Sequence, residues 1–582
     1  MSDPKDASKY TNALIPAIFF LLVFLYYLAP INAGDFWWHL NTGRWIWDNG
    51  SLPSVDPFTY TVPHDDDLRR TLILKGYWLA QLCIYHAYNI FGFKGLIFMK
   101  ASVFTLVSFL TWRLLRTFGL NRFIALALVY LPLTSMHLFE AVRPQILSLL
   151  GVVAVYYCIE NALLRMNAGR GGGFYLKLIP VIMLLWANVH RGFILGFMII
   201  LIYLAYVSME FLRRRTLSRR LYGSFAAYMG LALLASLVNP NIADAFVGNF
   251  IELGGPFSRW IDEFKTLREF AEYSGYEKIL YVYVALFVFS LSCMAAQWRS
   301  LKPVHVFLFA GFAIAGFTTF RFSMFFLFMS LCICAPYVSR TLGERMYLNR
   351  PALWIVMLVA LPLLVSGASK RNYLRLGPLE DLYLPDGAAG YIEQFRPPAP
   401  LFNAFEYGGY LGWRLYPEYK VFVDQRNLDV NVYDKYARSK GGRYREVFNE
   451  YGVNTVVFYL INPIINEIPS IVTYLMLSDE WEAVYVDRVS VVFVRKSAGA
   501  TLYALDKKEI WAFMEDNARN WALVAPGDTR PYLMLAYIFV AQEEWDKAFS
   551  SYSEVLRLDP DNETALLFVK AINKYRNQQG AR

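Results

Sequence analysis

The chain has 582 residues, of which 56% are hydrophobic and only 18% are charged. Soluble domains carry about a quarter charged residues, so this composition excludes a protein that is soluble over its whole length. The formal net charge is +9, but many basic residues lie in short loops between apolar runs, where they are expected on the cytoplasmic side of a membrane. The charge therefore does not indicate a nucleic-acid partner.

Apolar runs of about 18 to 22 residues, long enough to cross a bilayer as helices, recur from Ala13 to near Gly367. Basic clusters alternate with loops poorer in positive charge, which predicts about 11 spans, a cytoplasmic N-terminus and an external location for everything after Gly367. This count requires the amphipathic stretch 77–91, with Gln81 and His86, to lie at the interface. If that stretch spans, the count rises by one and the alternation fails.

The fold predicted from this pattern is a polytopic α-helical membrane protein with two further parts outside the membrane. The membrane domain covers 1–367 and has its first external loop over 31–94. A small external α/β domain follows over 368–500, and a helical region over 501–582 completes the chain.

Polar residues gather at span ends that this topology places outside, where they are costly in lipid. They supply a first set of candidate site residues: Asp35, His39, Glu140, Arg143, Asn188, His190, Arg191 and Arg321. Each cluster also has a purely structural interpretation, such as an aromatic belt of Trp37 and Trp38 at the headgroups, a proline that starts a helix, or a histidine satisfied by packing. Their concentration at one face predicts instead a shared cavity that opens outward.

The external α/β part offers a second set of candidates. Short β-rich runs alternate with helical ones there, and the runs 481–487 and 490–495 predict a hairpin at the edge of a sheet. The candidates are Tyr407, Gly408, Gly409, Asp424 and Arg426. The last two follow a β-rich run, where α/β folds tend to place ligand-binding residues. The first three either take part in binding or merely permit a tight turn over the sheet.

The region 501–582 is predicted to be helical. Its aromatic, leucine and alanine positions over 532–556, followed by a break at Asp559 and Pro560, resemble a single tetratricopeptide repeat. One repeat cannot form a long peptide-binding groove. We therefore expect this region to dock on the α/β domain or to present a small surface to a protein partner.

Several motifs together carry a resemblance to a known family. They are Asp35-Phe36-Trp37-Trp38-His39-Leu40, Arg143-Pro144-Gln145, Trp186-x-Asn188-x-His190-x-Gly192, and Tyr407-Gly408-Gly409-Tyr410 with Val423-Asp424-Gln425-Arg426. From about residue 10 to residue 500 the chain resembles GT-C membrane glycosyltransferases, among them the protein O-mannosyltransferases, the aminoarabinose transferases of lipid A and a large set of related bacterial membrane proteins. One feature departs from the mannosyltransferase pattern, which begins with two adjacent acids, because Phe36 follows Asp35.

The resemblance implies a reaction in which a sugar leaves a polyprenyl phosphate and is transferred with inversion. It implies Asp35 as the base that takes the acceptor's proton and Glu140 as a second carboxylate. Cations and hydrogen-bond donors stabilise a departing phosphate. The implied contacts to it are Arg143, Asn188, His190, Arg191 and Arg321, and His39 is implied either as a further contact or as the residue that orients the base.

Two functional classes remain open. The first is an integral-membrane glycosyltransferase of a bacterial inner membrane, with a polyprenyl-phosphate-linked donor in the lipid and a glycan, lipid or protein acceptor on the periplasmic side. The second is a non-catalytic scaffold of an envelope or polysaccharide-assembly system that uses the repeat-like region as its contact. The missing second acid favours the scaffold, and the gathered polar residues favour the enzyme. Carboxylates could hold a divalent metal, but no ligand cluster in the sequence requires one.

Overall fold

The computed structural model describes residues 4–31, 34–65, 67–214, 218–242, 244–248, 261–342, 384–440, 442–461, 468–499 and 502–579. The described chain is mostly helical and contains one small sheet. Contacts between residues divide it into two units. The first unit comprises Met1–Val55 and Asp65–Pro378, and the second comprises Asp56–His64 and Leu379–Arg582. The second unit thus includes a short piece of the loop that the sequence assigned to the membrane domain.

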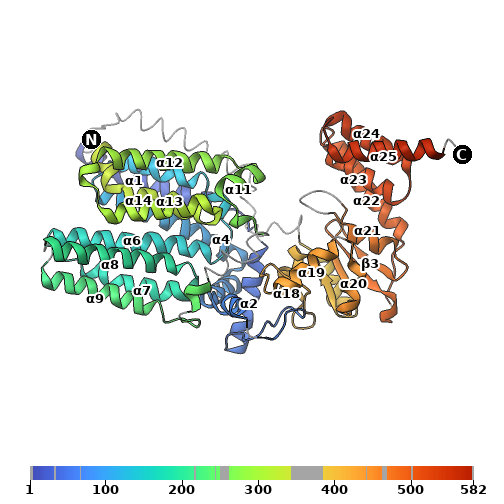
Figure 1. Ribbon diagram of the computed structural model, residues 1–582, viewed down its shortest axis with the longest axis horizontal. Coiled ribbons are helices and arrows are strands. Elements are labelled where there is room, and N and C mark those ends of the chain that lie inside the picture. The colour runs from blue at the N-terminus through green and yellow to red at the C-terminus, as the bar shows by residue number, and fades with distance from the viewer. Residues whose placement is uncertain are drawn as a thin grey trace. The chain divides into compact units, whose positions relative to one another are not determined.

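The first unit is a bundle of apolar helices (Figure 1). In chain order its helices are α1 (Pro4–Tyr26), α2 (Asp35–Asn49), α3 (Leu68–Lys75), α4 (Trp78–Thr117), α5 (Arg122–Leu133), η1 (Met136–Phe139), α6 (Gln145–Asn167), α7 (Gly173–Val189), α8 (Phe193–Arg214), α9 (Arg219–Ala235), η3 (Asp262–Phe264), α11 (Leu267–Ser274), α12 (Lys278–Ala296), η4 (Trp298–Ser300), α13 (Pro303–Thr318) and α14 (Phe320–Leu342).

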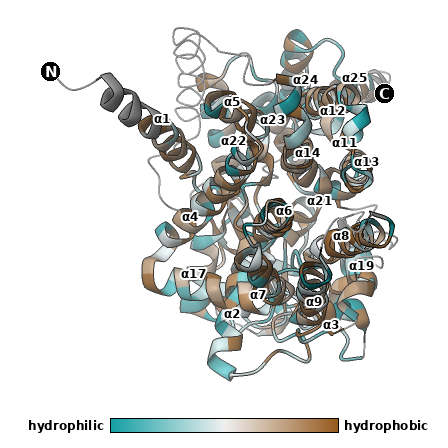
Figure 2. Ribbon diagram, turned by 90° about the vertical axis from the view of Figure 1, so that its left-hand side faces the viewer, coloured by the Kyte–Doolittle hydropathy of each residue, from teal (hydrophilic) through white to brown (hydrophobic). Residues whose placement is uncertain are grey.

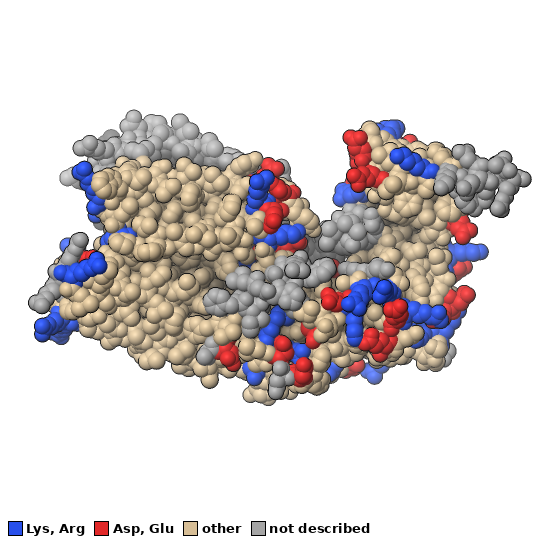
Figure 3. Space-filling model, in the orientation of Figure 1, with Lys and Arg blue, Asp and Glu red and all other residues tan. Residues whose placement is uncertain are grey.

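In the described part of the chain, 5 helices are long and apolar enough to cross a membrane. They are Leu68–Thr117, Gln145–Asn167, Phe193–Arg213, Lys278–Ala296 and Phe320–Leu342. Hydrophobic residues dominate the bundle in Figure 2. On the face of this unit shown in Figure 3, the middle is formed by uncharged residues, and the charged side chains gather at the two ends. These features identify a multi-pass membrane protein.

The predicted count of about 11 spans stays a prediction. Further apolar helices in the first unit are shorter: Leu14–Tyr26, Arg122–Leu133, Gly173–Val189 and Pro303–Thr318. The predicted apolar run that ends near Gly367 lies outside the described residues. Helix α4 breaks at Gly92, whose φ of 61° favours glycine, so 78–91 and 93–117 are separate helical segments. The break lies where the sequence predicted the end of an interfacial helix.

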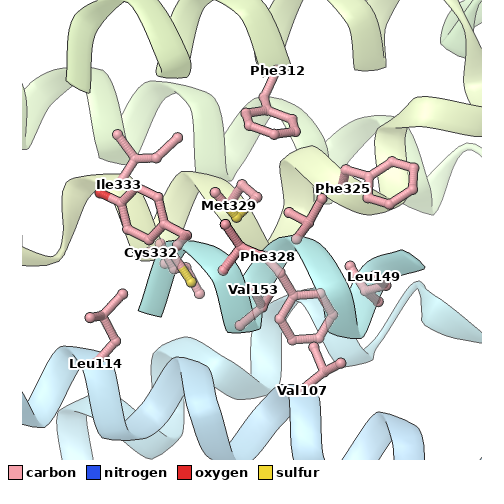
Figure 4. Packing of buried hydrophobic residues seen from close by; sticks show 14 of the residues in the cluster. Val107, Leu114, Leu149, Val153, Phe312, Phe325, Phe328, Met329, Cys332 and Ile333 are labelled. Carbon is pink, nitrogen blue, oxygen red and sulfur yellow. The ribbon is translucent and has the colours of Figure 1, made fainter. Parts of the chain in front are cut away.

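The core of the first unit forms around α14. Every side chain of this helix from Ser323 to Ser339 is buried, as expected for a helix that is apolar all round and surrounded by others. Figure 4 shows Phe325, Phe328 and Met329 of α14 packed among residues of three neighbouring helices. These residues are Val107 and Leu114 of α4, Leu149 and Val153 of α6, and Phe312 of α13. The packing fixes the first turn of α14, which carries Arg321.

The second unit combines a sheet with short helices. Its elements are α17 (Asp386–Phe395), β1 (Leu401–Asn403), η5 (Phe405–Tyr407), α18 (Gly408–Leu415), α19 (Val430–Lys440), α20 (Tyr444–Glu450), β2 (Thr455–Tyr459), α21 (Ser470–Leu477), β3 (Trp481–Val486), β4 (Ser490–Arg495), η6 (Lys496–Ala498), α22 (Lys507–Val524), α23 (Arg530–Ala541), α24 (Trp545–Leu558) and α25 (Glu563–Gln579).

The strand order is β1-β2-β4-β3, with β1 parallel to β2 and the other neighbours antiparallel. The predicted hairpin at 481–495 is confirmed, because β3 lies at the edge of the sheet and pairs only with β4. The β-rich run 420–424 is no strand of this sheet, and its Val421 forms an isolated parallel bridge with Thr59. Helices α22 to α25 pack on one another in succession, and their assignment as a tetratricopeptide-like region stays a prediction.

Candidate active site

Asp35 is the first residue of α2, so its carboxylate lies at the positive end of the helix dipole. Its Oδ2 is 3.1 Å from Nη2 of Arg143. Arg143 lies in the loop between η1 and α6, directly before the proline that precedes α6. The structure thus brings together the first and fourth of the residues predicted from the outer span ends.

Arg143 also contacts an acid that the sequence analysis missed. Its Nη1 donates a 2.5 Å hydrogen bond to Oε1 of Glu263, and Oε2 of the same carboxylate is 3.8 Å from Nε of Arg321. Asp35, Arg143, Glu263 and Arg321 therefore form a chain of alternating charges, which we call the carboxylate–arginine cluster. Its side chains are 24–30% exposed, so solvent and solutes can reach them.

The loop 262–274 carries Glu263 to this place. Helix α11 begins with a capping box between Thr266 and Glu269. Just before it, the carbonyl of Lys265 accepts a 2.8 Å hydrogen bond from the backbone N–H of Phe320, and the rings of Phe270 and Phe320 stack with centroids 3.5 Å apart. The loop is thereby fixed against the start of α14, beside Arg321.

Each charged group in the cluster stabilises the ionised form of its neighbours. Burial opposes ionisation of Glu263, but the charges of Arg143 and Arg321 and the hydrogen bond from Arg143 outweigh it and hold the pKa of Glu263 below its usual value. Burial likewise opposes the charge of Arg143, and the carboxylates of Asp35 and Glu263 more than compensate, so its pKa is raised. Both groups therefore remain charged at neutral pH.

A cavity of about 200 Å³ adjoins the cluster. Its lining residues are Pro30, His137, Leu138, Phe139, Glu140, Ala141, Arg143, Gln145, Ile146 and Glu263. Of the predicted site residues, Glu140 and Arg143 line this cavity directly. Asp35 and Arg321 connect to its walls through their ion pairs with Arg143 and Glu263.

His190 belongs to a second polar group, next to the end of α7. Its Nδ1 accepts hydrogen bonds from the backbone N–H of Gly192, at 2.9 Å, and from Ser148 Oγ, at 2.7 Å. Because the Gly192 N–H can only donate, Nδ1 is an acceptor, and the Ser148 hydroxyl, which itself accepts a 2.7 Å hydrogen bond from Trp186 Nε1, is the donor to it. With two donors on Nδ1, the imidazole is neutral and carries its proton on Nε2.

The environment keeps this imidazole neutral. Burial lowers the pKa of His190 well below its usual value, and the charges of Arg321, Arg191 and His39 lower it further. Arg191 donates two hydrogen bonds, at 2.9 and 2.5 Å, to the hydroxyl of Tyr77. The Tyr77 ring is close to both His39 and His190, with centroid separations of 5.6 and 5.5 Å. Three predicted residues thus meet around Tyr77, which the sequence analysis did not single out.

The remaining polar and aromatic residues of these motifs make contacts within the protein, and a binding role for Asn188 stays a prediction. Asn188 accepts a 2.9 Å hydrogen bond from Trp78 Nε1 and donates a 2.7 Å one to the carbonyl of Val238. Trp37 and Trp38 are buried in the protein, so they do not form the headgroup belt that their position allowed. Asn188 joins three segments of the bundle and contacts neither acid of the carboxylate–arginine cluster in the described contacts.

The candidates of the second unit are held in contacts of their own. The hydroxyl of Tyr407 donates to the carbonyl of Val489 at 2.9 Å. A Cβ on Gly408 would lie 2.7 Å from Cα of Asp424, so only glycine fits this turn. Arg426 is buried between two carboxylates, one of them that of Asp424. These contacts are structural, and a binding role for the five residues stays a prediction.

Glu263 could have been found from its position. It lies in the stretch 239–276, which is one of the loops poorer in clustered positive charge that are predicted to be external, and it is one of two adjacent acids shortly before a capped helix. Within the described ranges, no group of three or more His, Cys, Asp or Glu residues is arranged to hold a metal ion. The chemistry that the cluster offers is a carboxylate base beside two guanidinium groups, which bind phosphate well.

No family model and no curated protein sequence matches the chain. The archaeal oligosaccharyltransferase AglB from Archaeoglobus fulgidus, solved with an inhibitory peptide and a dolichol-phosphate, is similar with a TM-score of 0.52 and 15% identity, over 78% of this chain and 70% of its own. The arabinofuranosyltransferase AftD from Mycobacteria is similar with a TM-score of 0.53 and 13% identity, over 83% of this chain and 41% of its own. At these identities the likeness concerns the fold alone.

Both neighbours are membrane glycosyltransferases of the GT-C class. The chain therefore has a GT-C fold, which confirms the resemblance drawn from its motifs.

Proposed function

We propose that this protein is an integral-membrane glycosyltransferase that transfers a sugar from a polyprenyl-phosphate-linked donor to an acceptor on the external face of a bacterial inner membrane. The observation that carries the proposal is the carboxylate–arginine cluster beside the cavity of Glu140. A general base and two phosphate-binding cations are the groups that this reaction needs. Here they lie within one connected set of side chains in a GT-C fold.

In the proposed step, the Asp35 carboxylate takes the proton of the acceptor nucleophile. The nucleophile forms a bond to the anomeric carbon from the face opposite the phosphate, and the bond between that carbon and the phosphate oxygen breaks. The electron pair leaves with the polyprenyl phosphate, which gives inversion. Arg143 and Arg321 stabilise the phosphate as it gains charge.

The ion pairs of the cluster suggest how the base becomes available. Arg143 contacts the carboxylates of both Asp35 and Glu263, and a donor phosphate would compete with them for the same guanidinium. Once the phosphate binds Arg143, the carboxylate of Asp35 is released to accept a proton. Glu263 then keeps Arg321 and Arg143 oriented, and Glu140 faces the cavity as a second carboxylate.

His190, Arg191 and His39 provide a second, buried layer in this proposal. The neutral His190 offers one N–H donor from Nε2, and Arg191 is oriented by Tyr77. We propose that these groups support phosphate or sugar binding and are not the base. The helical region after residue 501 is a candidate surface for a protein partner.

The test compares two aspartates of the same helix. Asp35→Asn should reduce transfer by about 10²–10⁴-fold, because a general base contributes about that much. Asp48→Asn is the matched control, since Asp48 lies exposed on α2. Envelope glycans of cells that lack the gene, complemented with each variant, are measured by mass spectrometry, and membrane levels are measured in parallel.

The outcomes separate the two functional classes. Loss of a glycan with Asp35→Asn and its retention with Asp48→Asn support the transferase. Full retention with Asp35→Asn at normal protein level removes the catalytic role of Asp35 and favours a membrane scaffold. A glycan profile that does not change when the whole gene is deleted contradicts the proposed function.

A further inference from the structure

Segment 56–64 belongs to the second unit by its contacts. The backbone N–H of Val421 donates to the carbonyl of Phe58 at 2.9 Å, and the N–H of Tyr60 donates back to the carbonyl of Val421 at 3.3 Å. The hydroxyl of Thr61 donates to the carbonyl of Phe422 at 2.5 Å. These bonds attach the segment through an isolated parallel bridge to a run of the second unit that, in the described part of the chain, belongs to no strand of the sheet.

A buried ion cluster reinforces this attachment. Nη1 and Nη2 of Arg426 contact the two carboxylate oxygens of Asp56 at 2.7 and 3.1 Å, and the same guanidinium contacts Asp424 through Nε and Nη2. The side chains are only 1–4% exposed. Asp56 also accepts hydrogen bonds from the backbone N–H of Thr59 and Phe58, at 3.0 and 3.3 Å. We call Asp56, Arg426 and Asp424 the clasp.

The clasp has the properties of a structural attachment. A bidentate pair between a guanidinium and a carboxylate fixes both distance and orientation. Burial excludes solutes, and the ring of Phe58 covers the guanidinium, 5.1 Å from its centroid. Removal of one partner from such a pair leaves a buried charge without its counterion, which is costly. Segment 56–64 is therefore held strongly for so short a piece of chain.

The chain connects this segment at both ends to the first unit. Helix α2 ends at Asn49, and residues 50–55 lead from it to Asp56. Residues 65–67 lead from His64 to the start of α3 at Leu68. A domain attached to its neighbour by one connection generally moves relative to it, unless a further attachment restricts that motion. Through the clasp, the second unit has such an attachment, a few residues from the helix that begins with Asp35.

We propose that the clasp is a tether that restricts the motion of the second unit relative to α2, with Asp56 and Arg426 as positioning residues. The tether would also help the second unit take part in the acceptor step, and this role in the reaction rests on the proposed function. Asp56 and Arg426 do not touch the reacting atoms in this account. They act through the segment that they hold.

The first test measures motion and does not depend on activity. Spin labels are placed at Asp48→Cys on α2 and Glu446→Cys on α20, both exposed positions, in a Cys83→Ser background, because Cys83 is an exposed cysteine. The distance distribution between the labels should be narrow in this background and clearly broader after Asp56→Ala. Asp386→Ala, which removes an exposed partner of Arg414 in the second unit, is the matched control and should leave the width unchanged.

Hydrogen exchange verifies that Asp56→Ala acts as intended and leaves the second unit folded. Exchange should rise in peptides covering 56–64 and stay unchanged in β2 and β4. Equal distance distributions in Asp56→Ala and its parent, with raised exchange at 56–64, would overturn the tether. Unchanged exchange at 56–64 would overturn the clasp itself.

A covalent rescue tests the link to activity. Thr59 and Val421 are bridge partners, so Thr59→Cys with Val421→Cys should form a disulfide that replaces the clasp in the Asp56→Ala chain. We expect Asp56→Ala to lower kcat/KM for the acceptor at least tenfold, the oxidised disulfide to restore it, and reduction to abolish the rescue. An active parent with an unaffected Asp56→Ala variant would overturn the positioning role. An inactive parent would contradict the proposed function instead, and the spin-label experiment would still decide on the tether.

Discussion

The carboxylate–arginine cluster and the clasp are built from the same kinds of side chain, arginines between carboxylates, but they differ in solvent accessibility. In the first unit, Arg143 contacts Asp35 and Glu263, and in the second unit Arg426 contacts Asp56 and Asp424. The side chains of the former are 24–30% exposed and those of the latter 1–4%. An arginine between two acids is therefore no evidence of a binding site until its accessibility is known.

Accessibility changes what each cluster can do. A partly exposed guanidinium can exchange a carboxylate for a phosphate, because water and solutes reach it and the alternative state is solvated. A buried one cannot, since each charge in a medium of low polarity depends on its existing partner. We therefore propose ligand exchange for Arg143 and mechanical attachment for Arg426. Four predictions test this division.

The largest effect is expected on the stability of the second unit. Arg426→Met should lower its free energy of unfolding by about 3–5 kcal/mol, because two buried carboxylates lose their counterion. Arg414→Met removes an arginine from a more exposed ion pair in the same unit and should cost less than about 1 kcal/mol. Denaturant unfolding of the full chain in detergent, followed by hydrogen exchange in β2 and β4, measures both. Equal costs for the two variants would remove the distinction.

The next effect is on turnover in the first unit. Arg143→Gln should reduce transfer by about 10²–10³-fold, or roughly 3–4 kcal/mol in the barrier, because a charge-stabilising donor is lost. The thermal midpoint should change little, since the cluster is partly exposed. Arg268→Gln, on the exposed face of α11, is the control and should keep full activity. A variant of Arg143 that loses stability but retains turnover would place it with Arg426.

A smaller effect is expected on the stability of the first unit, from the close packing around His190. Gly192→Ala should destabilise the first unit by about 1–3 kcal/mol, as overpacking of a filled site does. The added Cβ would lie 2.5 Å from Ser148 Oγ and 2.8 Å from His190 Nδ1. Gly223, whose Cβ would meet nothing within 4 Å, provides the control Gly223→Ala. Thermal unfolding of both variants in detergent measures the difference, and equal midpoints would contradict the close packing.

The smallest effect is a pH dependence from His190. Its pKa is lowered in the fold, so the unfolded chain takes up the proton first as the pH falls. The stability that comes from the neutral imidazole is present above about pH 6.5 and is lost below it, by up to about 1.4 kcal/mol per pH unit. His190→Gln should therefore flatten the fall of the thermal midpoint between about pH 6.5 and pH 5. Parallel curves for the variant and the parent would contradict a buried neutral His190.

Part of the candidate site and of the fold was predictable, because short sequence motifs and the alternation of residues indicate these features. Asp35 and Arg143 follow recognisable motifs at the ends of apolar runs, and the hairpin of β3 and β4 follows from alternating residues and a short turn. The roles of Asp424 and Arg426 were not predictable in the same way. Their place after a β-rich run predicted a ligand site, which stays a prediction, whereas the buried ion pair of Arg426 with the distant Asp56 could not be read from that run.

Composition and short-range periodicity are enough to predict the membrane character, the apolar helices, the hairpin and most of the polar residues at the candidate site. Which charges meet depends on the packing of distant parts of the chain. Glu263 lies 120 residues from Arg143 and Asp56 lies 370 residues from Arg426. Such pairs depend on how packed helices and strands bring distant loops together. The residues that neighbour each partner along the chain do not indicate which distant residue it contacts. Whether an ion pair is exposed or buried depends on the same packing, and this property separates the candidate site from the clasp.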